Sequence, residues 1–148
     1  KHFFEFWILN LELELSIFSK IVNGEIPCYK IAEDNNYLAF LDVFPLAKGH
    51  TLVIPKKETD YIFSLNKSEY AGLWEFARKV APAIEKVVPC KRIGVTVIGL
   101  EVPHAHIHLI PINSVSDMNF ERPKLKFEKD EMEQTVKAIR EAYTGLYS

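Results

Sequence analysis

The sequence predicts an α+β domain in which a long helix packs on an antiparallel sheet, with a short helix before the sheet and another helix at the C-terminal end. Three observations support this class. Short β-rich runs are separated by turn residues, one long amphipathic helical pattern follows them, and a second helical pattern closes the chain. With 148 residues, 48% hydrophobic and 26% charged, the chain has the composition of one globular domain.

The N-terminal residues carry two patterns. Lys1–Leu9 is apolar and aromatic, but it is too short and too acidic for a transmembrane helix, and no small-residue cleavage site follows it. From Leu9 to Ile17 apolar and polar residues alternate, which predicts a half-buried strand that would pair with a sheet edge or a partner chain. We therefore treat residues 1–15 as an extension of unknown role, and we expect no contact with a membrane.

Turn and cap residues divide the next stretch into a helix and three strands. Ser16 is a good N-cap for a short helix that Gly24 would end. The strands Tyr29–Glu33 and Tyr37–Asp42 flank a turn of Asp and Asn residues and so predict a hairpin. The strand His50–Ile54 follows a loop and is stopped by proline.

The longest helix is predicted to begin at Asn66, a good N-cap residue. Its apolar positions form one continuous face: Tyr70, Leu73, Trp74, Ala77, Val80, Ala81, Ile84, Val87 and Val88. Pro82 lies inside this helix and should kink it. A β-rich run, Arg92–Ile98, comes next. Towards the C-terminus, Asn113–Phe127 has little periodicity and predicts a surface loop, whereas Asp130–Tyr143 predicts a closing helix that Gly145 would end.

Three of the five histidines, His104, His106 and His108, alternate in the run Pro103–Pro111. Alternation with period two is typical of a strand, so all three imidazoles are expected on one face and the apolar residues between them on the other. A row of groups that titrate near neutral pH indicates a functional site. Two chemistries remain open from the residues alone: a metal site, or nucleophilic and acid–base chemistry on an anionic substrate. No cysteine or carboxylate is evident beside the row as a fourth ligand, which disfavours the metal.

The net charge limits the classes of partner, and the cysteine content indicates the cellular location. The formal net charge of −2 argues against a general nucleic-acid-binding surface, so any phosphate recognition has to be local. Cys28 and Cys90 lie far apart and lack CxxC spacing, which fits a reduced cytoplasmic protein.

The histidine run resembles the histidine triad (HIT) motif, His-φ-His-φ-His-φ-φ, in which φ is apolar. Three further blocks resemble the same family in the same order: Ser16–Pro27, Ala39–Asp42 and Gly49–Lys56. Together they resemble the Hint-like nucleotide hydrolases and imply a HIT domain over residues 16–112, with residues 113–148 as a loop and helix packed on it. In that family two chains pair into a homodimer with a continuous antiparallel sheet.

The resemblance also implies roles for the histidines. His106 would be the nucleophile that attacks the α-phosphorus of a purine nucleoside phosphoramidate or related nucleotide, giving a nucleotidyl-histidine intermediate that water hydrolyses. Imidazole suits this role when it is neutral. His104 and His108 would contact phosphoryl oxygens, and His50 would support the cluster from the neighbouring strand. We expect no metal or other cofactor.

A second group of residues is expected to bind the nucleotide. Asp42 would accept hydrogen bonds from the ribose hydroxyls. The apolar slot for the base would consist of Ile17, Phe18, Ile21, Phe40 and Val43.

One segment departs from the family pattern. Hint-like proteins usually carry a Gly-rich loop before the triad, with an Asn and then a Gly-Gln pair. Val95–His104 is shorter, and Leu100 stands at the position of the Gln, so the amide that contacts substrate or leaving group is missing there. Two alternatives stay open: hydrolysis of dinucleoside polyphosphates, and nucleotide binding without turnover.

Overall fold

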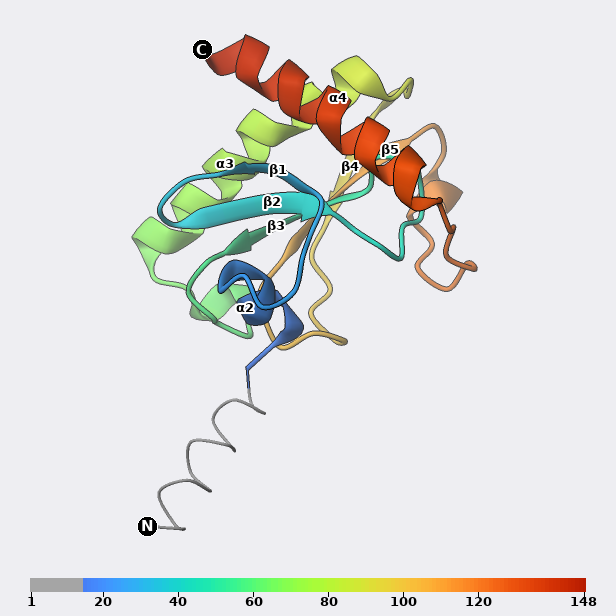
Figure 1. Cartoon of the computed structure of the whole chain (residues 1–148). Helices are drawn as coiled ribbons and strands as arrows, with labels where there is room; N and C mark the ends of the chain where they lie inside the picture. The colour runs from blue at the N-terminus through green and yellow to red at the C-terminus, as the bar shows by residue number, and fades with distance from the viewer. Residues whose placement is uncertain (1–14) are drawn as a thin grey trace, which may run out of the picture.

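The computed structural model describes residues 15–148, which form a five-stranded antiparallel sheet in the order β1-β2-β3-β5-β4 (Figure 1). The strands are β1 (Lys30–Glu33), β2 (Tyr37–Leu41), β3 (Thr51–Pro55), β4 (Arg92–Thr96) and β5 (Ile107–Ile112). The helices are α2 (Ile17–Val22), α3 (Lys67–Val87) and α4 (Lys129–Tyr147), with short 3₁₀ helices η1 (Ile62–Ser64) and η2 (Val115–Met118). The predicted α+β class is confirmed. The strand predicted from Leu9 lies outside the described residues, except for its end, where Ile17 begins α2.

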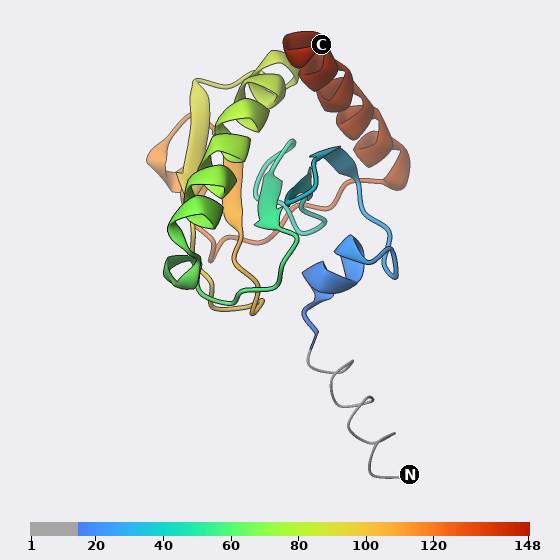
Figure 2. The same cartoon turned by 90° about the vertical axis from the view of Figure 1, so that its left-hand side faces the viewer.

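The two faces of the sheet pack on different helices. Figure 2 shows α3 along one side of the sheet and α2 on the other. Under α3 lies the larger apolar core, which includes Ala39, Val53 and Leu109 from three strands and also takes in the buried side of α4. The α2 face is smaller, and Phe18 packs there on Phe40 and its neighbours. No described helix is long and apolar enough to span a membrane.

The strand register explains how residues far apart in sequence reach the α2 face. Phe40 pairs with Leu52, and Leu52 pairs with His108, so these three side chains lie on one face of neighbouring strands. Side chains alternate along a strand, so positions two residues away, Asp42 and His50, are directed to the same face. The sheet therefore gathers the polar residues beside α2.

Local cap chemistry fixes where the helices begin and end. The Ser16 side chain accepts a hydrogen bond from Ser19 N–H at the start of α2, as predicted. The helix ends with Asn23 as its C-cap, and the following Gly24 takes the positive φ of 80° that glycine adopts without strain. Asn66 caps α3 as predicted, and the helix continues through Pro82.

Two sequence predictions on helix and strand limits were wrong. Gly145 does not end the last helix, because a glycine in a helix costs only about 1 kcal/mol and the residues beyond it pack on α3. The hydroxyl of Tyr147 donates to Lys79 O at 2.7 Å and holds this last turn in place. The histidine strand begins at Ile107 rather than Pro103, since the chain turns at His104, whose N–H donates to Val102 O.

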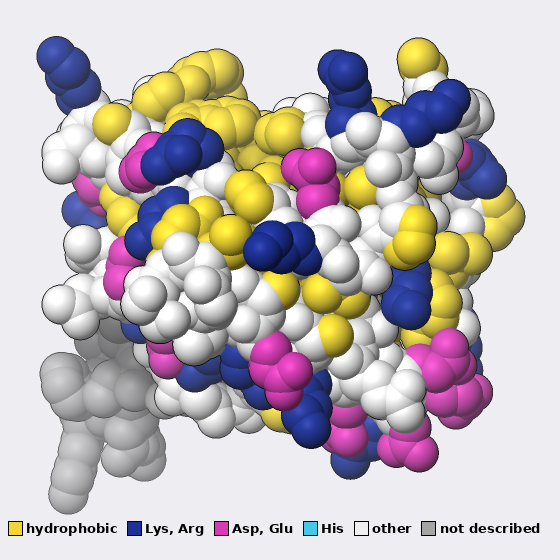
Figure 3. Space-filling view, turned by 90° about the horizontal axis from the view of Figure 1, so that it is seen from above, with side chains coloured by type: hydrophobic (Ala, Val, Ile, Leu, Met, Phe, Trp, Pro, Cys, Tyr) yellow, Lys and Arg dark blue, Asp and Glu magenta, His cyan; other side chains and the backbone are white. Residues whose placement is uncertain are grey.

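Charged side chains are mixed on the surface. The face of the molecule drawn in Figure 3 carries Lys and Arg side chains scattered among Asp and Glu, with apolar groups between them. This pattern agrees with the small net charge of −2 and leaves anion recognition to local sites.

Candidate functional site

A pocket of about 430 Å³ opens on the α2 face of the sheet, beside the histidines. Most residues that the sequence analysis assigned to the site line it: Ile17, Phe18, Ile21, Phe40, Asp42, Val43, His106 and His108. Two predicted residues do not line it, because His50 and His104 lie behind the wall and are almost fully buried. The structure thus brings the predicted apolar slot and two of the three triad histidines into one cavity.

The apolar side of the pocket comes from the short helix α2. Its N-cap, Ser16, starts the helix, and Phe18 lies edge-on to three rings, those of Phe40, His104 and His106. The Phe18 ring centroid lies 5.5 Å from that of Phe40 and 5.1 Å from that of His106. Ile17 is half exposed at the rim, so this side of the cavity offers an apolar slot that is open to solvent.

The hydrogen bonding of His106 fixes which of its nitrogens can react. Its Nδ1 lies 2.6 Å from His104 O, and a carbonyl oxygen can only accept, so Nδ1 carries the proton. In the neutral ring Nε2 then holds the lone pair, and it has no hydrogen-bond partner among the described residues. His106 therefore presents a nucleophilic nitrogen to the pocket.

A second chain of hydrogen bonds fixes His50 and His108. Leu46 N–H donates to His50 Nδ1 at 2.9 Å, so His50 carries its proton on Nε2. That Nε2–H donates to His108 Nδ1, also at 2.9 Å, which leaves the proton of neutral His108 on Nε2. Burial lowers the pKa of His50 to about 3, and burial together with the neighbouring His106 lowers the pKa of His108 to about 3. Both rings are neutral at pH 7, and His108 offers an N–H donor.

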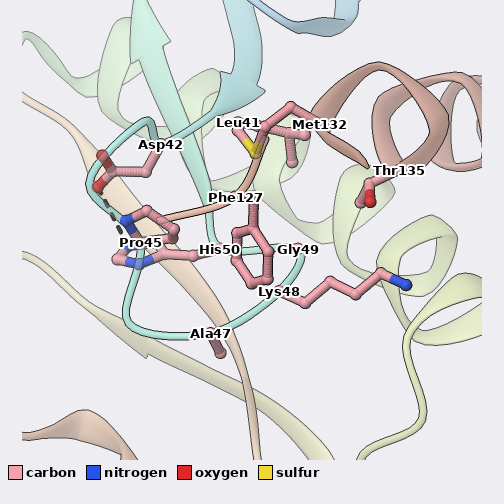
Figure 4. A pocket seen from close by; sticks show the side chains of 10 residues that line it. All are labelled: Leu41, Asp42, Pro45, Ala47, Lys48, Gly49, His50, Phe127, Met132 and Thr135. Atoms are coloured by element: carbon pink, nitrogen blue, oxygen red, sulfur yellow. Dashed lines mark ion pairs between the residues drawn. The ribbon is translucent and has the colours of Figure 1, made fainter. Parts of the chain in front are cut away.

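Asp42 lies at the end of β2 beside these rings. Its Oδ2 is 3.5 Å from His50 Nε2, a contact drawn as a dashed line in Figure 4. Its Oδ1 accepts from Phe44 N–H at 2.9 Å. Burial raises the pKa of the Asp42 carboxyl, and the Phe44 hydrogen bond opposes that rise. The carboxylate lines the pocket as well, so it can accept hydrogen bonds from a ligand there.

The expectation that no carboxylate lies beside the histidines was wrong. Asp42, His50 and His108 have ligand atoms within 4.8 Å of one another, close enough to hold a metal ion. His50 Nε2 and His108 Nδ1 share one proton at 2.9 Å, however, and a metal needs a lone pair from each nitrogen. Metal binding would thus require this hydrogen bond to break.

His104 has a different environment from the one predicted. Its side chain is fully buried, its Nε2–H donates to Pro55 O at 2.7 Å, and Ser16 Oγ–H donates to its Nδ1 at 2.8 Å. Both ring nitrogens are therefore in use, and the expected contact from His104 to a phosphoryl oxygen does not fit this geometry. His104 acts on the site through its carbonyl, which holds His106.

Glu58, which no sequence pattern indicated, joins α2 to the triad. Its Oε1 accepts from Ser16 N–H at 2.6 Å and from Ser19 Oγ–H at 2.8 Å, and it lies 3.9 Å from His104 Nδ1. Burial alone would raise the pKa of this carboxyl, but the hydrogen bonds from the two serines bring it below its usual value. Only its place three residues after the end of β3 could have drawn attention to it.

Phe120 and Lys124 were also missed, because they lie in the aperiodic segment predicted to be a plain surface loop. That segment folds back over the site: Leu125 N–H donates to Pro45 O at 2.8 Å. Both Phe120 and Lys124 line the pocket, and the Phe120 ring lies 4.8 Å from that of His108. Leu100 lines the same pocket and is 88% exposed, so an apolar side chain stands where an amide was expected.

Comparisons with known proteins agree with this geometry. Residues 23–115 match the HIT domain family. The chain is 33% identical to an uncharacterized HIT-like protein of Borreliella burgdorferi over 80% of this chain and 91% of that protein. It is 41% identical to the adenosine 5′-monophosphoramidase hnt1 of Schizosaccharomyces pombe over 64% of this chain and 72% of that protein. Its fold matches the crystal structure of a Hit-like protein from Bartonella henselae with a TM-score of 0.75 and 30% identity, covering 86% and 95% of the two chains.

Proposed function

This chain belongs to the HIT domain family, and on that premise we propose that it is a nucleotide hydrolase whose nucleophile is His106. The observation that carries the proposal is the 2.6 Å hydrogen bond from His106 Nδ1 to His104 O, because it leaves Nε2 free to attack. The substrate class is a purine nucleoside phosphoramidate or a related nucleotide. The relative hnt1, named as an adenosine 5′-monophosphoramidase, supports that choice.

The reaction has two balanced steps. In the first, His106 Nε2 forms a bond to the α-phosphorus while the bond from phosphorus to the leaving group breaks. An amine leaving group takes the electron pair of that bond and a proton from solvent. In the second step water attacks the phosphorus, the bond to His106 breaks and its electron pair returns to Nε2, and the attacking water releases a proton to solvent.

The other pocket residues have matching tasks in this proposal. The His108 Nε2–H would donate to a non-bridging phosphoryl oxygen, and this donor is held in place by His50 before substrate arrives. Asp42 would accept from the ribose hydroxyls, and Phe18 with its apolar neighbours would hold the base. His104 is a positioning residue, since its carbonyl sets the tautomer of His106.

Turnover of adenosine 5′-phosphoramidate by the wild type and by the variants H106N and H106A tests the proposal. We expect both variants to lose activity by about a thousandfold or more, as when a covalent nucleophile is removed. Denaturing the wild type during turnover of substrate labelled at the α-phosphate should trap label on the protein, and H106N should trap none.

The rival function is nucleotide binding without turnover, and the apolar Leu100 in place of an amide favours it. Calorimetric titration with AMP separates the two. Tight AMP binding by a wild type that neither turns over the phosphoramidate nor traps label would overturn the hydrolase and support the rival.

We also propose that two chains pair through β4. The sheet has β1 and β4 as its edges, and Arg140 on α4 covers β1 by donating to Lys30 O at 2.7 Å. β4 carries the exposed side chain of Val95, and a free edge of this kind suits pairing with a second copy. Light scattering should give a dimer for the wild type and a monomer for V95K if the proposal holds.

The free thiols of Cys28 and Cys90 support a cytoplasmic location.

A further inference from the structure

The pocket has an electrostatic imbalance for a site that would hold a nucleotide. Among the described residues that line it, Asp42 and Glu101 are carboxylates and Lys124 is the one lysine or arginine. The histidine that faces the phosphate cannot supply a cation, because burial and its neighbours lower the pKa of His108 to about 3. Lys124 therefore offers a positive charge to an anionic ligand in this pocket.

The Lys124 ammonium is held beside the histidines by its own segment. Its Nζ donates to Phe120 O and lies 5.4 Å from the centroid of the Phe120 ring. That ring packs edge-on to His108, with centroids 4.8 Å apart. The positive charge of Lys124 acts on both histidines. After burial and a neighbouring histidine, it helps to lower the pKa values of His50 and His108.

Lys124 lies on the His108 side of the pocket, where Asp42 also lies, whereas the apolar slot packs on His106. Phe18 packs on His106, on the α2 side of the pocket, whereas Phe120 packs on His108. A nucleotide with its base beside Phe18 and its α-phosphorus at His106 would direct the rest of the substrate towards Phe120 and Lys124. The lining of the pocket thus includes a cation, Lys124, and the apolar Leu100 where an amide was expected.

We propose that Lys124 is a specificity-determining residue that binds negative charge beyond the α-phosphate, so that the site prefers nucleotides whose leaving group is anionic. This inference rests on the proposed function, which it sharpens by naming the leaving-group class: phosphate or sulfate rather than an amine. In the step itself, His106 Nε2 bonds to the α-phosphorus as the phosphorus–oxygen bond breaks, and the oxyanion departs with the electron pair. A cation stabilises that departing charge without donating a proton.

Two adenylates that differ in the leaving group provide the test. Adenosine 5′-phosphosulfate releases sulfate, and adenosine 5′-phosphoramidate releases ammonia. The variant K124M should lower kcat/KM for the phosphosulfate by roughly tenfold to a hundredfold, the range for one charge-assisted hydrogen bond, and for the phosphoramidate by less than about threefold. K124R should keep most of the wild-type ratio of kcat/KM for the phosphosulfate to kcat/KM for the phosphoramidate. Higher salt should lower this ratio in the wild type.

Lys126 supplies the matched control, since it lies two residues away in the same segment and does not line the pocket. K126M should behave as the wild type on both substrates. If K124M lowers activity on both substrates equally, or on neither, while H106N still abolishes turnover, the inference fails and the proposed function stands.

A binding measurement keeps the inference testable if no turnover is found. ADP carries more charge beyond its α-phosphate than AMP does, so the wild type should bind ADP more tightly and K124M should lose that preference. A wild type with no turnover but with a Lys124-dependent preference for ADP would overturn the proposed function, while supporting the binding of negative charge beyond the α-phosphate by Lys124. Equal ADP-to-AMP affinity ratios in the wild type and K124M would overturn the inference.

Discussion

The two outer histidines of the triad are of one residue type and flank His106 symmetrically, yet they lie in opposite chemical environments. His104 is fully buried, and Pro55 and Ser16 occupy both of its ring nitrogens. Among the described residues, only His50 occupies a ring nitrogen of His108, its Nδ1, so the Nε2–H is available at the pocket wall. The difference shows that alternation along a chain orders the side chains, whereas partners on other segments decide which of them can meet a substrate.

Of the variants at the two outer histidines, H108N should lower catalysis the most. An Asn side chain can still accept the hydrogen bond from His50 but cannot place the Nε2–H donor on the phosphoryl oxygen. Loss of one such donor lowers kcat by about a hundredfold to a thousandfold, while the free energy of unfolding should change by less than about 1 kcal/mol. Steady-state kinetics on adenosine 5′-phosphoramidate and urea unfolding measure the two quantities. Near-normal kcat in H108N would mean that the Nε2–H of His108 does not contribute to catalysis.

H104A should show the converse, with its main effect on stability. It leaves Pro55 O and Ser16 Oγ without their ring partner and opens a cavity beneath α2. Cavities and unpaired buried groups of this kind lower the free energy of unfolding by about 2–4 kcal/mol. Urea unfolding followed by tryptophan fluorescence checks the value, with H108N as the matched control. If H104A were as stable as H108N, the hydrogen bonds of His104 to Pro55 and Ser16 would not stabilise the fold.

The sequence predicts the site residues that lie in or next to regular strands, but not those that are held by contacts with distant segments. Alternation predicted one face for the three histidines, and this holds for His106 and His108, which both line the pocket at the start of β5. It failed for His104, which lies in a turn before β5 and is held by α2 and β3. Lys124 lies in a segment without regular periodicity, whose path depends on tertiary contacts such as the bond from Leu125 N–H to Pro45 O. No local pattern encodes contacts of that kind.

The pH dependence of stability distinguishes His108 from a solvent-exposed histidine. Its pKa is about 6.5 when the chain is unfolded and about 3 when folded, so below pH 6.5 the unfolded state binds a proton that the folded state excludes. Stability is therefore complete above pH 6.5 and falls as the pH drops towards 3, by at most about 1.4 kcal/mol per pH unit for each such histidine. His50 contributes in the same direction, and Asp42, whose pKa is raised, in the opposite one. Urea unfolding of the wild type and H108N between pH 7 and pH 5 isolates the share of His108, and equal slopes would contradict its burial as a neutral ring.

Glu58 gives the smallest effect and the finest test, because it acts on the His104 end of the site without touching the pocket. In E58Q the amide oxygen can still accept from Ser16 N–H or Ser19 Oγ–H, but the hydrogen bonds lose the charge, and we expect a loss of about 1 kcal/mol of unfolding free energy. The folded-state pKa of Glu58 is lowered, so its contribution is present above the unfolded value near 4.5 and is lost as the pH falls below it. The exposed Glu25 supplies the control variant E25Q, which should match the wild type.

Because α2 carries the apolar slot, E58Q should raise KM for adenosine 5′-phosphoramidate by about two- to fivefold and leave kcat nearly unchanged. A fall in kcat with KM unchanged would instead mean that Glu58 acts through the tautomer of His106, and that the two ends of the histidine row are coupled rather than separate.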